Sequence, residues 1–226
     1  MILCFQRVLK NVPFGNKAIS MQFYKLKEQL KNFIVFSLGD IKTIAPTFRR
    51  ALLNDWQKKN YIKKIRRGFY MFSDTDINDS SLYLIANKIY QPSYISFEMA
   101  LSYYGLIPES VYGITSATTQ KTINFKTTFG TFIYHSIKPN LMFGYKLIKY
   151  QNQNFKMAEI EKCLLDYFYI NPHLKMSEDF EEMRINIDNF KEQVDLEKFK
   201  IFLEVFNNKS LESRMNKLIK YIYAHS

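Results

Sequence analysis

Basic, hydroxyl and amide side chains gather within residues 47–67, and these are side-chain types that contact nucleic acid. An arginine can donate two hydrogen bonds to O6 and N7 of a guanine, and lysine or arginine neutralises a phosphate. We identify eight candidate DNA-binding residues on this basis: Thr47, Arg49, Arg50, Asn54, Lys63, Lys64, Arg66 and Arg67. Whether Arg49 and Arg50 contact bases or phosphates stays open, because about half or more of protein–DNA hydrogen bonds go to the backbone.

These basic residues also have an interpretation without a ligand. Arg49 and Arg50 could be solvated residues at a helix start, although positive charges there oppose the helix dipole, which favours a role outside the helix. Lys63 and Lys64 could instead protect a sheet edge from pairing with another chain. For the two lysines, edge protection and phosphate contact are equally good interpretations.

A second group, Glu161, Lys162 and Asp166, has the residue types of a catalytic cluster. Glu161 and Asp166 are five residues apart, so they do not share a face of a helix. We therefore interpret the segment as a structural helix that buries its apolar side.

The sequence lacks the motifs of common enzymes. It contains no Gly-x-x-x-x-Gly-Lys, Gly-x-Gly-x-x-Gly, Gly-x-Ser-x-Gly or His-Glu-x-x-His pattern. Its three histidines lie far apart, and Cys4 and Cys163 have no neighbours at zinc-binding or disulfide spacing. We therefore expect no catalytic residue, no metal site and no cofactor.

Charge is distributed unevenly along the 226 residues, which carry a net charge of +11. Through residue 73 there are 15 Lys and Arg against 3 Asp and Glu, whereas the remainder has 17 against 18. A uniformly lysine-rich surface would predict an even distribution. The basic first third instead predicts a polyanion-binding module joined to a part with another task.

No apolar run approaches the roughly 20 residues that a membrane-spanning helix needs. The N-terminal apolar cluster at residues 1–5 precedes the basic residues, which is the reverse of a secretion signal. We therefore expect a cytoplasmic protein that has no membrane partner.

The elements around the basic residues follow the order of a winged helix-turn-helix. A helix is expected at residues 21–32, and Ser37 with Asp40 can cap a second helix that stops before Pro46. Pro46 would begin the third helix, in which Phe48 faces the core and the exposed side enters the major groove. Strands at 61–65 and 69–72, joined by a turn at residues 66–68, would form the wing.

The remaining chain predicts a different domain. Residues 74–81 are polar and acidic, as in a linker, and helices follow at 82–90 and from Ser96, the expected cap. The β-rich runs at 111–148 predict a small antiparallel sheet, and helices follow at 157–171, 177–187, 195–206 and 210–223. The expected fold class is α+β, with an N-terminal extension (1–20), a winged helix-turn-helix (21–73), a linker (74–81) and a mixed domain (82–226). Met21 is an alternative start of the chain.

Three blocks of this sequence resemble the AbiEi-like antitoxins of abortive-infection, type IV toxin–antitoxin systems. They are YIKKIRRGFY at residues 61–70, PSYISFEMALSYYGL at 92–106 and AEIEKCLLD at 158–166, where Cys163 replaces the usual alanine. Their order and spacing agree with the family over roughly residues 21–170. Within the last two blocks, the candidate antitoxin-domain residues are Tyr94, Ser96, Tyr104, Glu161, Lys162 and Asp166.

The resemblance implies a phage-defence antitoxin that represses its own promoter through the winged helix, on double-stranded DNA that contains inverted repeats. It further implies that the C-terminal domain counteracts a nucleotidyltransferase-like toxin, without requiring a stable complex. Two alternatives stay open: a stand-alone transcriptional regulator whose C-terminal domain senses a ligand or dimerises, and an RNA-binding module. The oligomeric state stays open as well.

Overall fold

The computed structural model describes residues 14–108 and 113–224 of the chain. Contacts between residues divide the chain into two compact units, Met1–Ile77 and Asn78–Ser226. Both combine helices with a sheet, so the fold class is α+β, as predicted. Of the predicted extension at 1–20, residues 1–13 lie outside the described residues, and 14–20 belong to a helix.

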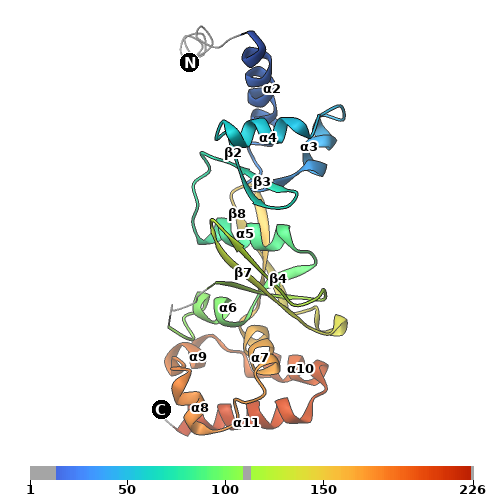
Figure 1. Ribbon diagram of the computed structural model, residues 1–226. Helices are drawn as coiled ribbons and strands as arrows, with labels where there is room; N and C mark the ends of the chain where they lie inside the picture. The colour runs from blue at the N-terminus through green and yellow to red at the C-terminus, as the bar shows by residue number, and fades with distance from the viewer. Residues whose placement is uncertain (1–13, 109–112, 225–226) are drawn as a thin grey trace. The chain divides into compact units, whose positions relative to one another are not determined.

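The first unit contains a three-stranded antiparallel sheet and three described helices (Figure 1). In chain order the elements are α2 (Phe14–Leu30), β1 (Phe36–Ser37), α3 (Leu38–Ile44), α4 (Ala51–Lys58), β2 (Ile62–Arg66) and β3 (Phe69–Phe72). The strand order is β1-β3-β2, which places β2 at an edge. Side chains from all these elements form one apolar core around Trp56, which is fully buried.

The start of α3 confirms the predicted cap. The hydroxyl of Ser37 accepts a hydrogen bond from the backbone N–H of Asp40, and the carboxylate of Asp40 accepts one from the N–H of Ser37 at 2.7 Å. This reciprocal pair satisfies two backbone donors that would otherwise lack a partner at the helix start. The helix ends at Ile44, before Pro46, as expected.

The predicted start of the third helix at Pro46 is wrong. Pro46 and Thr47 lie in a turn closed by a hydrogen bond of 2.9 Å from the N–H of Phe48 to the carbonyl of Ala45. The helix α4 begins five residues later, at Ala51. Proline is also favoured at the second position of a β-turn, where its fixed φ is suitable. Pro46 therefore marks a turn and not the start of a helix.

The hairpin of β2 and β3 confirms the predicted pair of strands. Gly68 has φ +88° in the turn, a conformation that glycine adopts without strain. A register shift between Lys64 and Arg66 marks an irregularity in β2.

The second unit is built on a six-stranded mixed sheet of order β6-β7-β5-β4-β9-β8. The strands are β4 (Ser93–Ile95), β5 (Ile114–Thr118), β6 (Ile123–Thr127), β7 (Gly130–Ser136), β8 (Tyr145–Tyr150) and β9 (Gln153–Ala158). The prediction of a small antiparallel sheet is therefore wrong in size and direction. Two pairs, β5 with β7 and β4 with β9, are parallel, and parallel pairing joins segments that are distant in sequence.

Helices lie on both faces of this sheet (Figure 1). The helix α5 (Asp79–Ile89) covers one face, while α6 (Phe97–Tyr103) and α7 (Ile160–Ile170) cover the other. The helix α5 begins inside the segment predicted as a linker, and Asn78 caps it. A short 3₁₀ helix, η1 (Pro139–Leu141), precedes β8.

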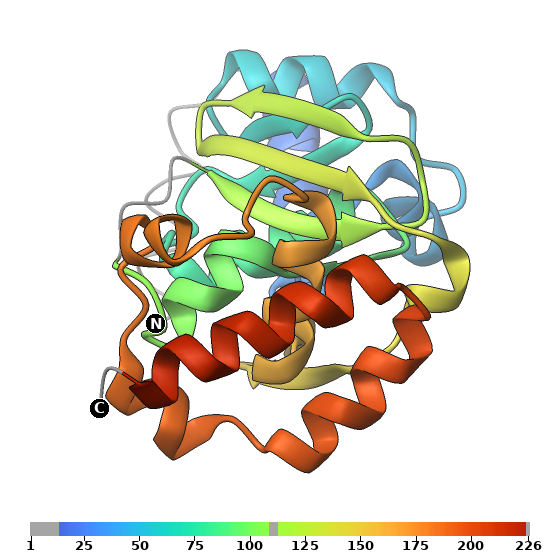
Figure 2. The ribbon, with the colours of Figure 1, turned by 90° about the horizontal axis from the view of Figure 1, so that it is seen from below.

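Four described helices follow α7 toward the C-terminus. They are α8 (Ser177–Glu182), α9 (Ile187–Gln193), α10 (Leu196–Phe206) and α11 (Lys209–Ala224). Figure 2 shows α11 crossing α7, and both α10 and α11 contact it. The single helix predicted at 177–187 is interrupted near Arg184, which has φ +51°. Among the described helices, none has the length and apolar character needed to cross a membrane.

Candidate functional site

The eight candidate DNA-binding residues all belong to the first unit, and most are exposed. Seven of them have exposed side chains and Arg66 is half-buried. Thr47, Arg49 and Arg50 precede α4, with Arg50 at its N-cap position, and Asn54 lies on the helix. The other four belong to β2 and its turn: Lys63, Lys64, Arg66 and Arg67.

Buried neighbours direct Arg49 and Arg50 outward. Phe48 and Leu52 are each 5% exposed and pack in the core of the first unit. The ring of Phe48 lies against Trp56, with centroids 5.3 Å apart. Because these apolar side chains anchor the segment from inside, the two arginines between them remain exposed.

At the hairpin, Arg66 is oriented by an aromatic ring. Its guanidinium lies 5.8 Å from the centroid of the Phe69 ring, within range of a cation–π contact. The neighbouring Arg67 is exposed beside Gly68. The end of the hairpin therefore presents one oriented and one exposed arginine.

In the second unit, four of the six candidate antitoxin-domain residues meet in one buried polar cluster. Tyr94 and Ser96 each donate a hydrogen bond of 2.8 Å to Oδ2 of Asp166. Lys162 donates to the Tyr94 hydroxyl at 2.8 Å and forms an ion pair with Oδ1 of Asp166. All four residues are completely buried. We name Tyr94, Ser96, Lys162 and Asp166 the buried cluster.

This arrangement corrects the expectation for Ser96. It occupies the N-cap position of α6, but its side chain makes no capping hydrogen bond. The hydroxyl instead donates a charge-assisted hydrogen bond to the Asp166 carboxylate.

Burial dominates the electrostatics of the cluster. It raises the pKa of the Asp166 carboxyl, and the ion pair with Lys162 and the bonds from Tyr94 and Ser96 offset part of that shift. Burial also lowers the pKa of Lys162, again opposed by Asp166, and it raises that of Tyr94 well above its ordinary value.

Aromatic rings enclose the Lys162 ammonium on its other sides. Its Nζ lies 4.9 Å from the ring centroid of Phe206 and 5.1 Å from that of Phe143. Gly144 has φ +66°, and a Cβ there would lie 3.1 Å from two carbons of the Lys162 side chain. Protein atoms therefore shield the Lys162 side chain completely from solvent.

The cluster connects the blocks at residues 92–106 and 158–166. Tyr94 and Ser96 come from β4 and the start of α6, whereas Lys162 and Asp166 come from α7. The spacing of Lys162 and Asp166, four residues apart on a helix, was a signal for their pairing that the comparison of Glu161 with Asp166 missed.

The remaining two candidates, Tyr104 and Glu161, lie outside the cluster. Tyr104 donates a hydrogen bond of 2.7 Å to the carbonyl of Ala158, and burial raises its pKa. Glu161 accepts one from the N–H of Asp195 at 3.0 Å and lies 3.6 Å from Lys198. These bonds connect α7 to α10 and to the neighbouring segment.

Arg214 is a further important residue that sequence reasoning did not identify. It is 4% exposed, and its guanidinium donates to the carbonyls of Phe168 and Asn171 at the end of α7. These bonds satisfy helix-terminal carbonyls and place a cation at the negative end of the helix dipole. Nothing local in the sequence indicates this contact across 43 residues or more.

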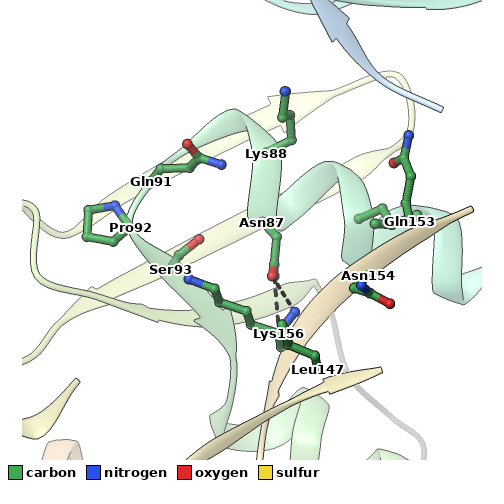
Figure 3. Close-up of a pocket in the computed structure, with 10 residues that line it drawn as sticks. Asn87, Lys88, Gln91, Pro92, Ser93, Leu147, Gln153, Asn154 and Lys156 are labelled. Carbon is green, nitrogen blue, oxygen red and sulfur yellow. Dashed lines mark hydrogen bonds between the residues drawn. The ribbon is translucent and has the colours of Figure 1, made fainter. Parts of the chain in front are cut away.

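Several cavities border described residues of the second unit. A cavity of about 680 Å³ is bordered by Glu98, His135 and Tyr167, and one of about 290 Å³ lies between α5, β4 and β9 (Figure 3). Burial lowers the pKa of His135, and nearby Glu98 opposes that shift. Among the described residues, no three His, Cys, Asp or Glu side chains are grouped to hold a metal ion.

The sequence matches no family model, and no curated protein matches it. The function is therefore proposed from the residues described above.

Proposed function

We propose that this protein is an autorepressing antitoxin of a type IV toxin–antitoxin system, in which the first unit binds promoter DNA as a winged helix. The main support for this proposal is the order helix–strand–helix–helix–hairpin, with exposed basic residues before α4 and on the hairpin. In a winged helix-turn-helix, the helix that corresponds to α4 enters the major groove and the hairpin lies along phosphates.

The late start of α4 refines this proposal. Arg49 and Arg50 lie just before the helix, so they approach the DNA from the turn, and Asn54 is the candidate that projects from the helix itself. Asparagine can pair with the N6 and N7 atoms of an adenine. A mobility-shift assay on the upstream region of its own gene and on random DNA tests the proposal; equal affinity for both would contradict autorepression.

The antitoxin role is supported by the sequence resemblance and assigned to the second unit. The blocks at residues 92–106 and 158–166 supply the buried cluster and its connection between β4, α6 and α7. We interpret this cluster as a framework that maintains the domain, while the toxin-directed surface lies elsewhere.

Co-expression with the neighbouring gene tests the antitoxin role. We expect the neighbouring gene to be toxic and the intact protein to relieve the growth inhibition. The variant in which Arg49 and Arg50 are both replaced by alanine should relieve it as well, because the antitoxin role is assigned to residues 78–226. A neighbour without toxicity, or toxicity that the intact protein does not relieve, would contradict the proposal.

A second candidate function is a stand-alone regulator that senses a ligand. The observation that favours it is the cavity of about 680 Å³, in which the Oε2 atom of Glu98 is buried and has no hydrogen-bond partner. The gene neighbourhood distinguishes the two candidates, since an antitoxin gene should overlap or adjoin a nucleotidyltransferase gene.

A further inference from the structure

The cavity of about 290 Å³ in the second unit combines positive charge with hydrogen-bond donors. Its lining comes from α5, the segment before β4, and the strands β8 and β9: Leu84, Asn87, Lys88, Gln91, Pro92, Ser93, Leu147, Gln153, Asn154 and Lys156 (Figure 3). None of these described lining residues is acidic, and two are lysines. The cavity therefore favours an anion.

Ser93 gives the cavity a buried polar group that lacks a partner. The residue is 3% exposed, and its Oγ atom makes no hydrogen bond within the described structure. A buried hydroxyl without a hydrogen bond lowers stability, and such a group in a native protein calls for an explanation, of which a bound ion is one. Ser93 lines the cavity, so a bound acceptor could take its proton in a hydrogen bond.

The backbone of Lys156 is hydrogen-bonded to the side chain of Asn87. Its N–H donates to Oδ1 of Asn87 at 2.6 Å, and the amide of Asn87 donates back to the Lys156 carbonyl at 3.4 Å. Figure 3 shows these two bonds, and it shows the side chain of Lys156 extending toward Ser93. Its ammonium lies 5.1 Å from the ring centroid of Tyr145, which further restricts it. A charge and a hydroxyl are thus preorganised on one side of the cavity.

We propose that this cavity binds the phosphate group of a phosphorylated molecule. A phosphate offers several acceptor oxygens in a tetrahedral arrangement, which suits a hydroxyl, an ammonium and amide donors that approach from different elements. Lysine is a common phosphate ligand that acts as a point charge. The volume is near the lower limit of small-molecule pockets, so it accommodates a phosphate with a small substituent.

The site is distinct from the DNA-binding surface. All its lining residues belong to Asn78–Ser226, whereas the candidate DNA-binding residues belong to Met1–Ile77. Failure of DNA binding and failure of phosphate binding are therefore separate results.

Titration of the intact, isotope-labelled protein with inorganic pyrophosphate, followed by amide NMR, tests the proposal. We expect saturable shifts at Ser93, Asn87 and Lys156. Lys156→Gln should weaken binding at least about tenfold, and Ser93→Ala about two- to tenfold, because they remove a charged and a neutral hydrogen bond. Lys149→Gln is the matched control, since it removes an exposed charge from β8 and should leave the affinity unchanged.

Two results would overturn the proposal, and further titrations identify the source of the phosphate. A cavity that holds only water would give no saturable shift, and a charged surface without a site would make Lys149→Gln as damaging as Lys156→Gln; either result overturns the proposal. Spectra of the free variants that match the wild-type spectrum show that folding is intact. Parallel titrations with adenosine monophosphate and with a short oligonucleotide that lacks a terminal phosphate then identify whether the phosphate comes from a nucleotide or from a nucleic acid.

Discussion

Lys162 and Asp166 form an ion pair across one turn of α7, and both side chains are fully shielded from solvent. A buried pair of charges gains stability only when each partner is fully hydrogen-bonded. Here Tyr94 and Ser96 satisfy the second carboxylate oxygen, so the pair belongs to a larger network. The network connects segments separated by about 70 residues.

Breaking this pair from one side should destabilise the second unit strongly. Lys162→Met leaves the Asp166 carboxylate buried without its counter-charge, and we expect a loss of about 3–5 kcal/mol in the free energy of unfolding. Urea denaturation followed by circular dichroism measures it. Lys149→Met, which removes an exposed lysine, is the control and should change stability by less than about 0.5 kcal/mol. A loss in Lys162→Met no larger than in the control would contradict the role of the cluster.

The cap of α3 should contribute measurably to the first unit. Ser37→Ala removes the acceptor for the Asp40 N–H, and loss of a serine cap lowers stability by about 0.5–2 kcal/mol. Thr43→Ala is the matched control, because its exposed hydroxyl bonds only within the helix, to the carbonyl of Gly39. Thermal unfolding of the two variants should place Ser37→Ala clearly below Thr43→Ala. Equal melting temperatures would show that the cap contributes nothing.

Elements defined by neighbouring residues could be predicted from the sequence. The pairing of Ser37 with Asp40 and the glycine turn at Gly68 are local signals, since each involves residues within a few positions. The basic residues of the first unit could likewise be listed, because exposure follows from the buried stripe around Phe48 and Leu52. Local patterns thus predicted most of the first unit.

Contacts between distant segments could not be predicted in the same way. Ile95 pairs with Met157 in parallel strands, whereas the sequence predicts only the helix from Ser96 in this region, because the short strand that contains Tyr94 is buried on both faces and shows no alternation. The buried cluster depends on that pairing, since it places Tyr94 beside α7. Only the Lys162–Asp166 spacing was visible locally. The error at Pro46 has another origin, because the same residue suits both a helix start and a turn.

Stability should depend on pH through His135. Burial holds the pKa of its imidazole below the ordinary value of 6.5, so the unfolded chain binds the proton more readily than the folded one. The free energy of unfolding should therefore decrease as the pH falls through 6.5 toward the lower folded pKa. His135→Gln should reduce that decrease, as measured by urea denaturation at pH 7.5, 6.5 and 5.5 (about one unit on either side of the reference pKa). An NMR titration of the imidazole with a midpoint at or above 6.5 would refute the prediction.

Arg49 and Arg50 allow base recognition to be distinguished from phosphate contact. Replacing an arginine that reads a guanine should weaken binding to the specific site by about 1–3 kcal/mol and affect random DNA less. Replacing one that contacts a phosphate should weaken both equally and reduce the salt dependence of binding by about one phosphate contact. We expect at least one of Arg49→Ala and Arg50→Ala to affect the specific site more, because both side chains are exposed beside the start of α4. Lys25→Ala removes an equal charge from the exposed surface of α2 and serves as the control in titrations by fluorescence anisotropy at several salt concentrations. If all three variants lose the same small amount of affinity for both DNAs, the segment before α4 does not contact bases, and the DNA-binding proposal is contradicted for Arg49 and Arg50.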